Sequence, residues 1–317
     1  MHLNHAGCSQ RWLMATLLVM FGVGSLAAAP LVPGTGRKLD QVGDDFEDEG
    51  WEYTYNNPKS TRENDNSDRL PGGVSKNGRW YEGMKRGQPD VIKRVATPPG
   101  GLPGSQGSLL LRSLYTGIPG RPSYHMQQDD FIADVNYRLG GGIPVSRGPS
   151  AVVRVFLPPV ATWEKRTGPQ FAFRLSLETT VSKPQPGVFF SGSRRENETY
   201  WPGMFVEFEN KKPGREHDYA YLRLRANSGG GDFKSVQITT TGWWTLGLSV
   251  TPDGMVHYYA KPGIEDLTAK DYITSQYPYS FRAERFKTFF FNVCNGDDGK
   301  TWSTSWIIDD PAVYVAR

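Results

Sequence analysis

The stretch that most constrains the fold of this chain is residues 243–260, WWTLGLSVTPDGMVHYYA. Large apolar residues alternate with small or polar ones over 244–250, and this period of two predicts a strand with one row of side chains in a core. The following TPDG at 251–254 predicts a turn, because proline fixes φ and glycine accepts the positive φ that closes the turn. A return strand at 255–260 would complete an antiparallel hairpin.

Similar short runs recur along the chain and predict further strands at 109–115, 151–157, 171–177, 204–209, 219–226, 236–240, 287–294 and 303–315. A short helix is expected at most within 264–273, IEDLTAKDYI. Residues 51–108 are rich in Pro and Gly and poorly periodic, which predicts long ordered loops around short strands. The sequence therefore predicts an all-β fold, a two-sheet antiparallel jelly-roll sandwich with long N-terminal loops.

The first 28 residues have the pattern of a secretory signal peptide, with a weakly basic start, an apolar run over 12–26 and small residues at 27–29. The apolar run is short for a membrane span, which needs about 20 residues, so we expect no transmembrane segment in the mature chain. We expect residues 29–43 to form a linker and residues 44–317 to form one domain. The protein is expected to be secreted or periplasmic.

Charge and cysteine content exclude several classes of function. The formal net charge is +3, or +2 once Arg11 leaves with the signal peptide, which is too small to indicate nucleic acid as a partner. Removal of the signal peptide also takes Cys8 and leaves Cys294 alone, so the core must provide the stability that a disulfide would give. Cys294 ends an apolar run, which favours a buried inert thiol over a reactive nucleophile.

Three segments carry a family resemblance. The hairpin at 243–263, in which a Trp opens a strand and a Val-x-Tyr-Tyr strand returns, resembles one in concanavalin A-like lectin/glucanase domains, particularly laminin G-like modules. WIIDDPAVYV at 306–315 and DDFE at 44–47 resemble the last and first strands of such domains. The resemblance implies a two-sheet jelly roll that is often a carbohydrate-binding module, sometimes a glycosidase or polysaccharide lyase, and commonly has one structural calcium.

Acidic residues near the two ends of the expected domain are candidates for that structural Ca²⁺. Calcium takes several hard oxygen ligands, and carboxylates of the first and last strands would supply them if those strands lie side by side. The candidates are Asp45, Glu47, Asp309 and Asp310. The alternative is that they are edge-strand and turn carboxylates facing water. The acidic loop at 295–299 lacks the spacing of an EF-hand loop and predicts a tight turn.

Two enzyme chemistries are open. A polysaccharide lyase neutralises a uronate carboxylate with Arg or Gln and abstracts the adjacent proton with His or Tyr. Residues with this chemistry on expected strands are Arg223, Arg225, His257 and Tyr259. However, Thr239 stands where alginate-lyase-like domains carry the His of Gln-(Ile/Val)-His, and outward Arg often pairs with Glu across a sheet. A glycoside hydrolase needs two carboxylates, for which Glu207 and Glu209 share a strand face, but the third carboxylate of laminarinase-type enzymes is missing.

A binding module needs aromatic platforms for sugar rings and planar hydrogen-bonding groups beside them. Aromatic residues in or beside expected loops are Trp80, Tyr81, Tyr200, Trp201, Trp243 and Trp302. Tyr200, Trp201 and Trp302, with Arg223 and Arg225, are the candidate ligand-binding residues, although any one loop Trp is more often buried under its own segment. We expect an exported, non-catalytic, lectin-like domain whose partner is a polysaccharide or glycan. The alternatives are a polysaccharide-active enzyme, lyase or glycoside hydrolase, and a structural or protein-interaction domain of the cell envelope.

Overall fold

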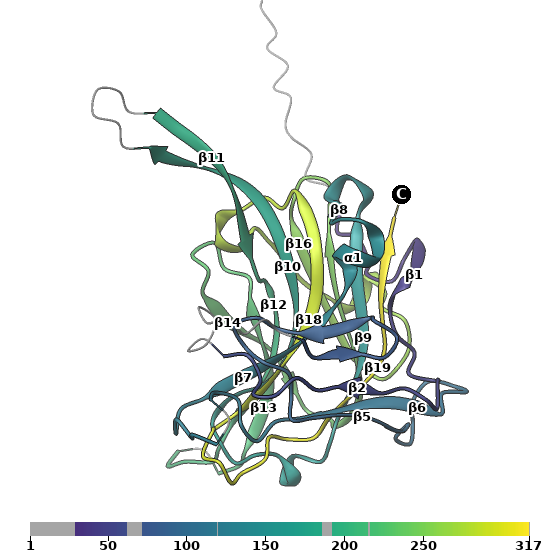
Figure 1. The fold of residues 1–317 in the computed structure, drawn as a ribbon, viewed down its shortest axis with the longest axis vertical. Helices are drawn as coiled ribbons and strands as arrows, with labels where there is room; N and C mark the ends of the chain where they lie inside the picture. The colour runs from purple at the N-terminus through teal and green to yellow at the C-terminus, as the bar shows by residue number, and fades with distance from the viewer. Residues whose placement is uncertain (1–28, 62–71, 119, 186–191, 215, 317) are drawn as a thin grey trace, which may run out of the picture.

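The computed structural model describes residues 29–61, 72–118, 120–185, 192–214 and 216–316, and Figure 1 shows its fold. Strands of this part of the chain form an eight-stranded and an eleven-stranded sheet that share one hydrophobic core. The strand pairings within both sheets are antiparallel. The predicted all-β, two-sheet antiparallel sandwich is therefore confirmed. The expected signal peptide, residues 1–28, lies outside the described residues.

The strands of the eight-stranded sheet are β1 (Arg37–Gly43), β5 (Val91–Ala96), β6 (Gly107–Arg112), β9 (Pro149–Leu157), β15 (Gly242–Val250), β16 (Val256–Pro262), β17 (Tyr272–Gln276) and β19 (Trp306–Val315). They lie in the order β17-β16-β15-β9-β19-β6-β5, and β1 pairs with β19. The first and last strands of the chain therefore lie side by side in this sheet.

The strands of the eleven-stranded sheet are β2 (Tyr53–Thr54), β3 (Val74–Ser75), β4 (Trp80–Glu82), β7 (Gln127–Ala133), β8 (Ile143–Pro144), β10 (Gly168–Gln185), β11 (Gly192–Tyr200), β12 (Gly203–Glu209), β13 (Tyr219–Arg225), β14 (Asp232–Ile238) and β18 (Arg285–Asn295). They lie in the order β14-β13-β12-β10-β18-β7-β4-β3-β2, while β11 pairs with β10 and β8 with β18. In Figure 1, β10 and β11 extend past the rest of the sheet as a two-stranded arm.

Helical structure in the described residues is limited to α1 (Val135–Leu139) and the 3₁₀ turns η1 (Val145–Arg147), η2 (Val160–Thr162), η3 (Ala269–Asp271) and η4 (Pro278–Ser280). The helix allowed within 264–273 is only η3, which Thr268 and Asp271 close with a capping box. It ends there because Tyr272 begins β17, which pairs with β16. No helix in the described ranges has the length and apolar character needed to cross a membrane.

The predicted hairpin is confirmed. β15 and β16 pair from Trp244 opposite Pro262 to Val250 opposite Val256. The turn between them closes with a hydrogen bond from the Gly254 amide to the Thr251 carbonyl (2.8 Å). Glycine is required at position 254, because φ is +82° and a Cβ there would lie 2.6 Å from the backbone nitrogen of Ala283.

Part of the expected linker is a strand. Residues 37–43, RKLDQVG, form β1 and pair with β19, with Arg37 opposite Val315. Leu39 and Val42 are buried, but their spacing of three hides the strand from a search for alternation. The segment before β1 also contacts the domain, since the Ser249 hydroxyl donates to the Leu31 carbonyl (2.5 Å).

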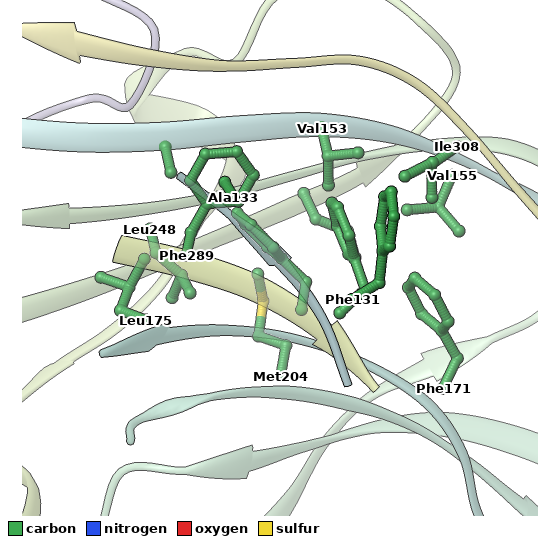
Figure 2. Packing of buried hydrophobic residues seen from close by; sticks show 14 of the residues in the cluster. Phe131, Ala133, Val153, Val155, Phe171, Leu175, Met204, Leu248, Phe289 and Ile308 are labelled. Carbon is green, nitrogen blue, oxygen red and sulfur yellow. The ribbon is translucent and has the colours of Figure 1, made fainter. Parts of the chain in front are cut away.

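The core lies between the two sheets, where apolar rows of both interdigitate. Figure 2 shows Leu248 of the eight-stranded sheet beside Leu175 and Phe289 of the eleven-stranded sheet. The N-terminal loops are fixed to this core by Trp80, whose ring stacks on Phe131 with 4.6 Å between ring centroids. Trp80 thereby positions the loop that follows β4.

The outer face of the eight-stranded sheet is covered around β16. Tyr259, which points outward because its neighbour Tyr258 is in the core, packs with Val152 and Leu267 and is 1% exposed. A side chain at Gly247 would collide with Leu267 and with Pro33, so residues of two loops lie directly on the sheet.

Candidate functional site

A groove with a volume of about 470 Å³ lies on the outer face of the eleven-stranded sheet. This volume is within the range of about 300–1,000 Å³ that is typical of small-molecule sites. The side chains that line it come from β7, β10, β13, β18, the loop after β4, η4 and the residue after β11. The lining residues are Gly83, Met84, Lys85, Arg86, Gln128, Asp130, Ile132, Arg174, Trp201, Arg225, Tyr279 and Phe290.

Strand alternation and register set the positions of two groove arginines. Arg174 on β10 points outward because Phe173 and Leu175 are in the core. It lies opposite Gly203 of β12, which lies opposite Arg225 of β13. The two arginines are therefore two strands apart, about 10 Å across the sheet. Gly203 makes room between them, because a Cβ there would lie 2.5 Å from Cγ of Arg174.

Arg174 is a buried cation at the base of the groove and is only 6% exposed. Its guanidinium donates to the Trp201 carbonyl from Nη2 (2.7 Å) and Nε (3.3 Å), and to Oδ1 of Asn292 from Nη1 (3.3 Å). It also lies 5.3 Å from the ring centroids of both Phe205 and Phe290. Burial, and next the charge of Arg225, lower the pKa of Arg174 to about 10. The side chain therefore stays charged at neutral pH.

Asp130 is linked to Arg174 by hydrogen bonds through the side chain of Asn292. Its Oδ1 accepts hydrogen bonds from Nδ2 of Asn292 (2.6 Å) and Nε2 of Gln128 (3.2 Å). Burial raises the pKa of Asp130 to about 6, although the positive charges of Arg86 and Arg174 oppose this shift. Asp130 is the one carboxylate among the described lining residues. Its side chain gains a negative charge as pH rises through about 6.

The two arginines predicted from the sequence are held by acidic partners. Arg225 makes a bidentate pair with Asp232, Nε to Oδ1 at 2.8 Å and Nη2 to Oδ2 at 3.0 Å. Arg223 donates from Nε to Glu207 (2.7 Å) and also pairs with Asp232. The cross-strand pairing with acidic residues that we gave as the alternative is therefore present. Arg225 lines the groove, whereas Arg223 does not appear among the described lining residues.

The four predicted lyase residues do not form one site, and this prediction is wrong. Arg223 and Arg225 point outward from the eleven-stranded sheet, because Leu222 and Leu224 are in the core. His257 and Tyr259 lie on β16 in the other sheet, on the covered side opposite the core. His257 contacts the Ser275 hydroxyl through Nδ1 (2.5 Å) and the Thr251 hydroxyl through Nε2 (2.8 Å). The sandwich separates the two pairs.

The predicted aromatic platforms have different outcomes. Trp201 is 45% exposed and lines the groove, as a platform requires. Tyr200 is 2% exposed and packs against Tyr279 and Phe281, so its assignment to ligand binding is wrong. It lies opposite Leu177, a core residue, so its side chain points toward the core. Trp302 stacks under the guanidinium of Arg112 (4.8 Å) and is not among the described groove residues.

The four calcium candidates lie near one end of the β1–β19 pair, where carboxylate oxygens of Asp45, Glu47 and Asp309 already accept hydrogen bonds. Glu47 accepts from the Gln106 amide (3.0 Å), and buried Asp309 accepts from the Ser105 hydroxyl (3.0 Å). Burial and the charges of Asp45 and Glu47 raise the pKa of Asp310. Within the described ranges, no three His, Cys, Asp or Glu side chains gather closely enough to hold a metal ion. The calcium site stays a prediction.

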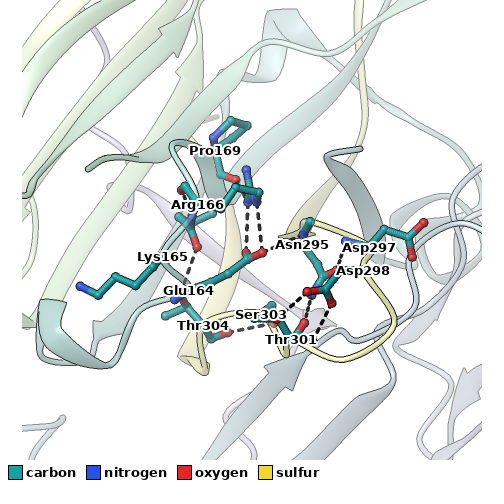
Figure 3. A network of polar contacts seen from close by, with 12 residues as sticks. Glu164, Lys165, Arg166, Pro169, Asn295, Asp297, Asp298, Thr301, Ser303 and Thr304 are labelled. Atoms are coloured by element: carbon teal, nitrogen blue, oxygen red, sulfur yellow. Dashed lines mark hydrogen bonds and ion pairs between the residues drawn. The ribbon is translucent and has the colours of Figure 1, made fainter. Parts of the chain in front are cut away.

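The acidic loop predicted at 295–299 is held by side-chain hydrogen bonds that extend to Thr301. Figure 3 shows Asp298 turned back onto Thr301, whose amide (2.6 Å) and hydroxyl (2.6 Å) both donate to it. Glu164 accepts from the Gly296 amide (2.8 Å) and pairs with Arg166 (3.2 Å). The preceding residue, Cys294, is buried with its pKa raised to about 12, consistent with an inert thiol.

Comparisons with known proteins give no family. No family model matches the chain, and no curated protein matches it in sequence. Similar solved structures include a mutant of the GH43 protein BlXynB of Bacillus licheniformis (10% identity, 83% of this chain and 40% of that chain, TM-score 0.37). A GH131 β-glucanase catalytic domain of Podospora anserina is also similar (10% identity, 74% of this chain and 84% of that chain, TM-score 0.42). So is an alginate lyase of Pseudomonas aeruginosa (8% identity, 73% of this chain and 85% of that chain, TM-score 0.34). Likenesses at this level carry no conclusion about activity, and the concanavalin A-like resemblance stays a prediction.

Proposed function

We propose that this chain binds an acidic, uronate-containing polysaccharide in the groove of the eleven-stranded sheet and does not cleave it. The observation that carries the proposal is the charge of the lining, which has Lys85, Arg86 and Arg174 against the single carboxylate of Asp130; the fourth cation, Arg225, is paired with Asp232. A basic, concave site favours an anionic ligand. Guanidinium groups match the planar geometry of a carboxylate, which makes a uronate a better fit than a neutral sugar.

The remaining lining residues suit a sugar ring. Trp201 offers an exposed aromatic surface at the edge of the groove, and a pyranose ring presents C–H groups to such a surface. Gln128, whose amide nitrogen donates to Asp130 (3.2 Å), also lines the groove, and its carbonyl oxygen is an acceptor for ring hydroxyls. An apolar platform beside charged and amide groups is the combination that orients a charged carbohydrate.

Non-catalytic binding is favoured over hydrolysis because the groove lacks a pair of carboxylates. A glycoside hydrolase places two of them about 5–9.5 Å apart, whereas the described lining has Asp130 alone. Glu207 and Glu209 do not supply the pair, because Glu207 binds Arg223 and Glu209 accepts from the Tyr219 hydroxyl (2.9 Å).

One observation favours a second candidate function, that of a uronate lyase. Tyr279 lines the groove and is close enough to Arg174 and Arg225 to influence the pKa of both. In a lyase reaction an arginine would neutralise the uronate carboxylate, and Tyr279 would remove the proton on the adjacent carbon while the glycosidic oxygen leaves with the bonding electrons. The products would then carry a new carbon–carbon double bond.

A single assay separates these functions. Purified protein is exposed to neutral and uronate-containing polysaccharides, and both retained binding and the near-ultraviolet absorbance of unsaturated products are measured. We expect retention on uronate polymers without new absorbance. New absorbance would establish the lyase and make Tyr279→Phe the next variant, whereas retention on neutral polymers alone would contradict the proposal. The expected export of the protein agrees with such a partner and rests on the pattern of residues 1–28.

Trp201→Ala is expected to weaken binding of an acidic oligosaccharide about tenfold, because it removes the exposed stacking surface, a loss of about 1.4 kcal/mol. The unfolding free energy should change by less than about 0.5 kcal/mol, since the side chain is 45% exposed. Isothermal titration calorimetry and urea unfolding measure the two effects. Trp302→Ala is the control, and an equal loss of affinity in that variant would contradict the assignment of Trp201.

Asp130→Asn tests the pH dependence of the groove. Asp130 ionises as pH rises through about 6, and its negative charge then repels an acidic ligand. The affinity of the unmodified protein for an oligouronide should therefore fall about three- to tenfold between about pH 5 and pH 7.5. The variant keeps Oδ1 as the acceptor for Asn292 and Gln128 but has no charge to gain, so its affinity should stay level. A parallel fall in both proteins, measured by titration calorimetry, would assign the effect to another group.

A further inference from the structure

The arm, residues 179–185 of β10 and 192–198 of β11, is a two-stranded ribbon that projects from the sandwich (Figure 1). β10 has partners on both sides up to Glu178, where its pairing with β18 ends. Beyond that residue its pairing is with β11, from Thr179 opposite Glu198 to Gln185 opposite Gly192. An isolated two-stranded ribbon is marginally stable in water, so contacts made by its side chains matter for its stability.

The two faces of the arm differ. Alternation places Lys183, Arg194, Glu196 and Glu198 on the face that continues the core side of the sheet, because Tyr200 points toward the core. These side chains pair with one another. Lys183 lies 3.2 Å from both Glu196 and Glu198, and Arg194 lies 3.2 Å from Glu196. Cross-strand ion pairs of this kind hold the ribbon together.

The other face continues the groove side of the sheet, since its β10 residues are an even number of positions from Arg174. Its residues are Thr180, Ser182 and Pro184 of β10 and Ser193, Arg195 and Asn197 of β11. Ser182, Arg195 and Asn197 are exposed. This face therefore presents hydroxyl and amide groups with one guanidinium, which match the hydroxyls and spaced carboxylates of a uronate chain.

Charged residues lie between the groove and the arm. Glu178, the last β10 residue before the arm, is 3.2 Å from Lys287 and 3.8 Å from Arg285. Glu284, whose carboxylate accepts from the Thr180 amide (3.2 Å) and hydroxyl (2.8 Å), is a second anion here, so the two cations and two anions of this junction balance. From Arg174 to Ser182 the strand rises about 26 Å, eight residues at about 3.3 Å each, which exceeds the reach of a mono- or disaccharide.

We propose that the groove side of the arm binds further units of the same acidic polysaccharide, so that the natural ligand is a polymer lying across both the groove and the arm. This inference rests on the proposed function of the groove. Because one polysaccharide chain would make both contacts, its affinity rises with oligomer length once the oligomer is long enough to reach the arm.

Arg195→Ala and Arg194→Ala form a matched pair that tests the arm. The two residues are adjacent and exposed, and each change removes one positive charge, but only Arg195 is on the groove side. Affinities for a short oligouronide and for a long one are measured by titration calorimetry at about 0.15 M salt, where distant charges are screened. We expect Arg195→Ala to weaken binding of the long oligomer about tenfold and to leave the short one unchanged. Arg194→Ala should change neither by more than about twofold.

The outcomes separate failure of the arm from failure of the groove. If both variants weaken the long oligomer equally, or neither does, the arm is not a binding surface, even where the short oligomer still binds the groove. If the short oligomer does not bind the unmodified protein, the proposed function fails and the inference fails with it. Asn197→Ala provides a second variant on the groove side with no change of charge, and it should also weaken only the long oligomer.

Discussion

Arg174→Met is expected to lower affinity for acidic oligosaccharides about a hundredfold or more. The change removes a buried cation from the base of the groove, and truncating one partner of a buried, hydrogen-bonded charge typically costs about 2–5 kcal/mol of binding free energy. It also leaves the Trp201 carbonyl and Oδ1 of Asn292 without their donor, which lowers the unfolding free energy by about 1–3 kcal/mol for each group. Titration calorimetry and urea unfolding measure the two losses.

Arg154→Met is the matched control for this variant. Arg154 is also a buried arginine, 7% exposed, but it lies on β9 in the other sheet. It donates to the Ile264 carbonyl (3.1 Å) and to Asp266 (2.6 Å). This control should lose stability and retain binding. A folded Arg174→Met protein that binds as tightly as the unmodified one would contradict the proposal that the groove binds the ligand.

Arg174→Lys provides a second variant in case the Met protein does not fold. Lysine keeps the charge but not the planar fork that reaches both Trp201 and Asn292. Affinity should fall about tenfold, between the values of the unmodified protein and the Met variant. Unchanged affinity would show that charge alone, without the geometry of the guanidinium, recognises the ligand.

The sequence predicts the fold well because the fold depends on local patterns. The alternation at 244–250 and the TPDG turn describe a hairpin without reference to the rest of the chain. β1 escapes prediction for a local reason, since its buried Leu39 and Val42 do not alternate. Its strand character comes instead from pairing with β19, which is more than 260 residues away along the chain.

The site is harder to predict because it depends on which strands are neighbours. Asp130, Arg174 and Asn292 come from β7, β10 and β18, and only the sheet order brings them together. Arg174 does interrupt the apolar row QFAFRLSL at 170–177, which marks it as an outward charge. Nothing local to Asp130 or Asn292 indicates that they share a hydrogen-bond chain with it.

The error over His257 and Tyr259 has a different cause. A period of two shows that they do not belong to the core row, but it does not show whether the opposite face is open to solvent. Here that face is covered, and Tyr259 packs against Leu267 of the loop that follows β16. The chemistry inferred from residue type was reasonable, but the environment needed for that chemistry is missing.

His257→Gln is therefore expected to change stability and leave carbohydrate binding intact. Burial lowers the pKa of His257 to about 4, against an opposing effect of Asp253, so the native imidazole is neutral above that pH. In the unfolded chain the pKa returns to about 6.5. As pH falls from about 6.5 to 4, the unfolded state binds a proton that the native state does not, and the stability contributed by neutral His257 is lost. A shift of about 2.5 pKa units corresponds to about 3 kcal/mol.

The measurement is the unfolding free energy of both proteins in urea at pH 7 and at pH 4. Between these values the unmodified protein should lose about 3 kcal/mol more than His257→Gln does. Burial raises the pKa of Asp309 to about 7, so Asp309 makes a contribution of the opposite sign. That contribution is present in both proteins and cancels in the difference. If the variant loses affinity at pH 7 while its pH-dependent stability matches that of the unmodified protein, His257 contacts the ligand, and its placement in the covered face is wrong.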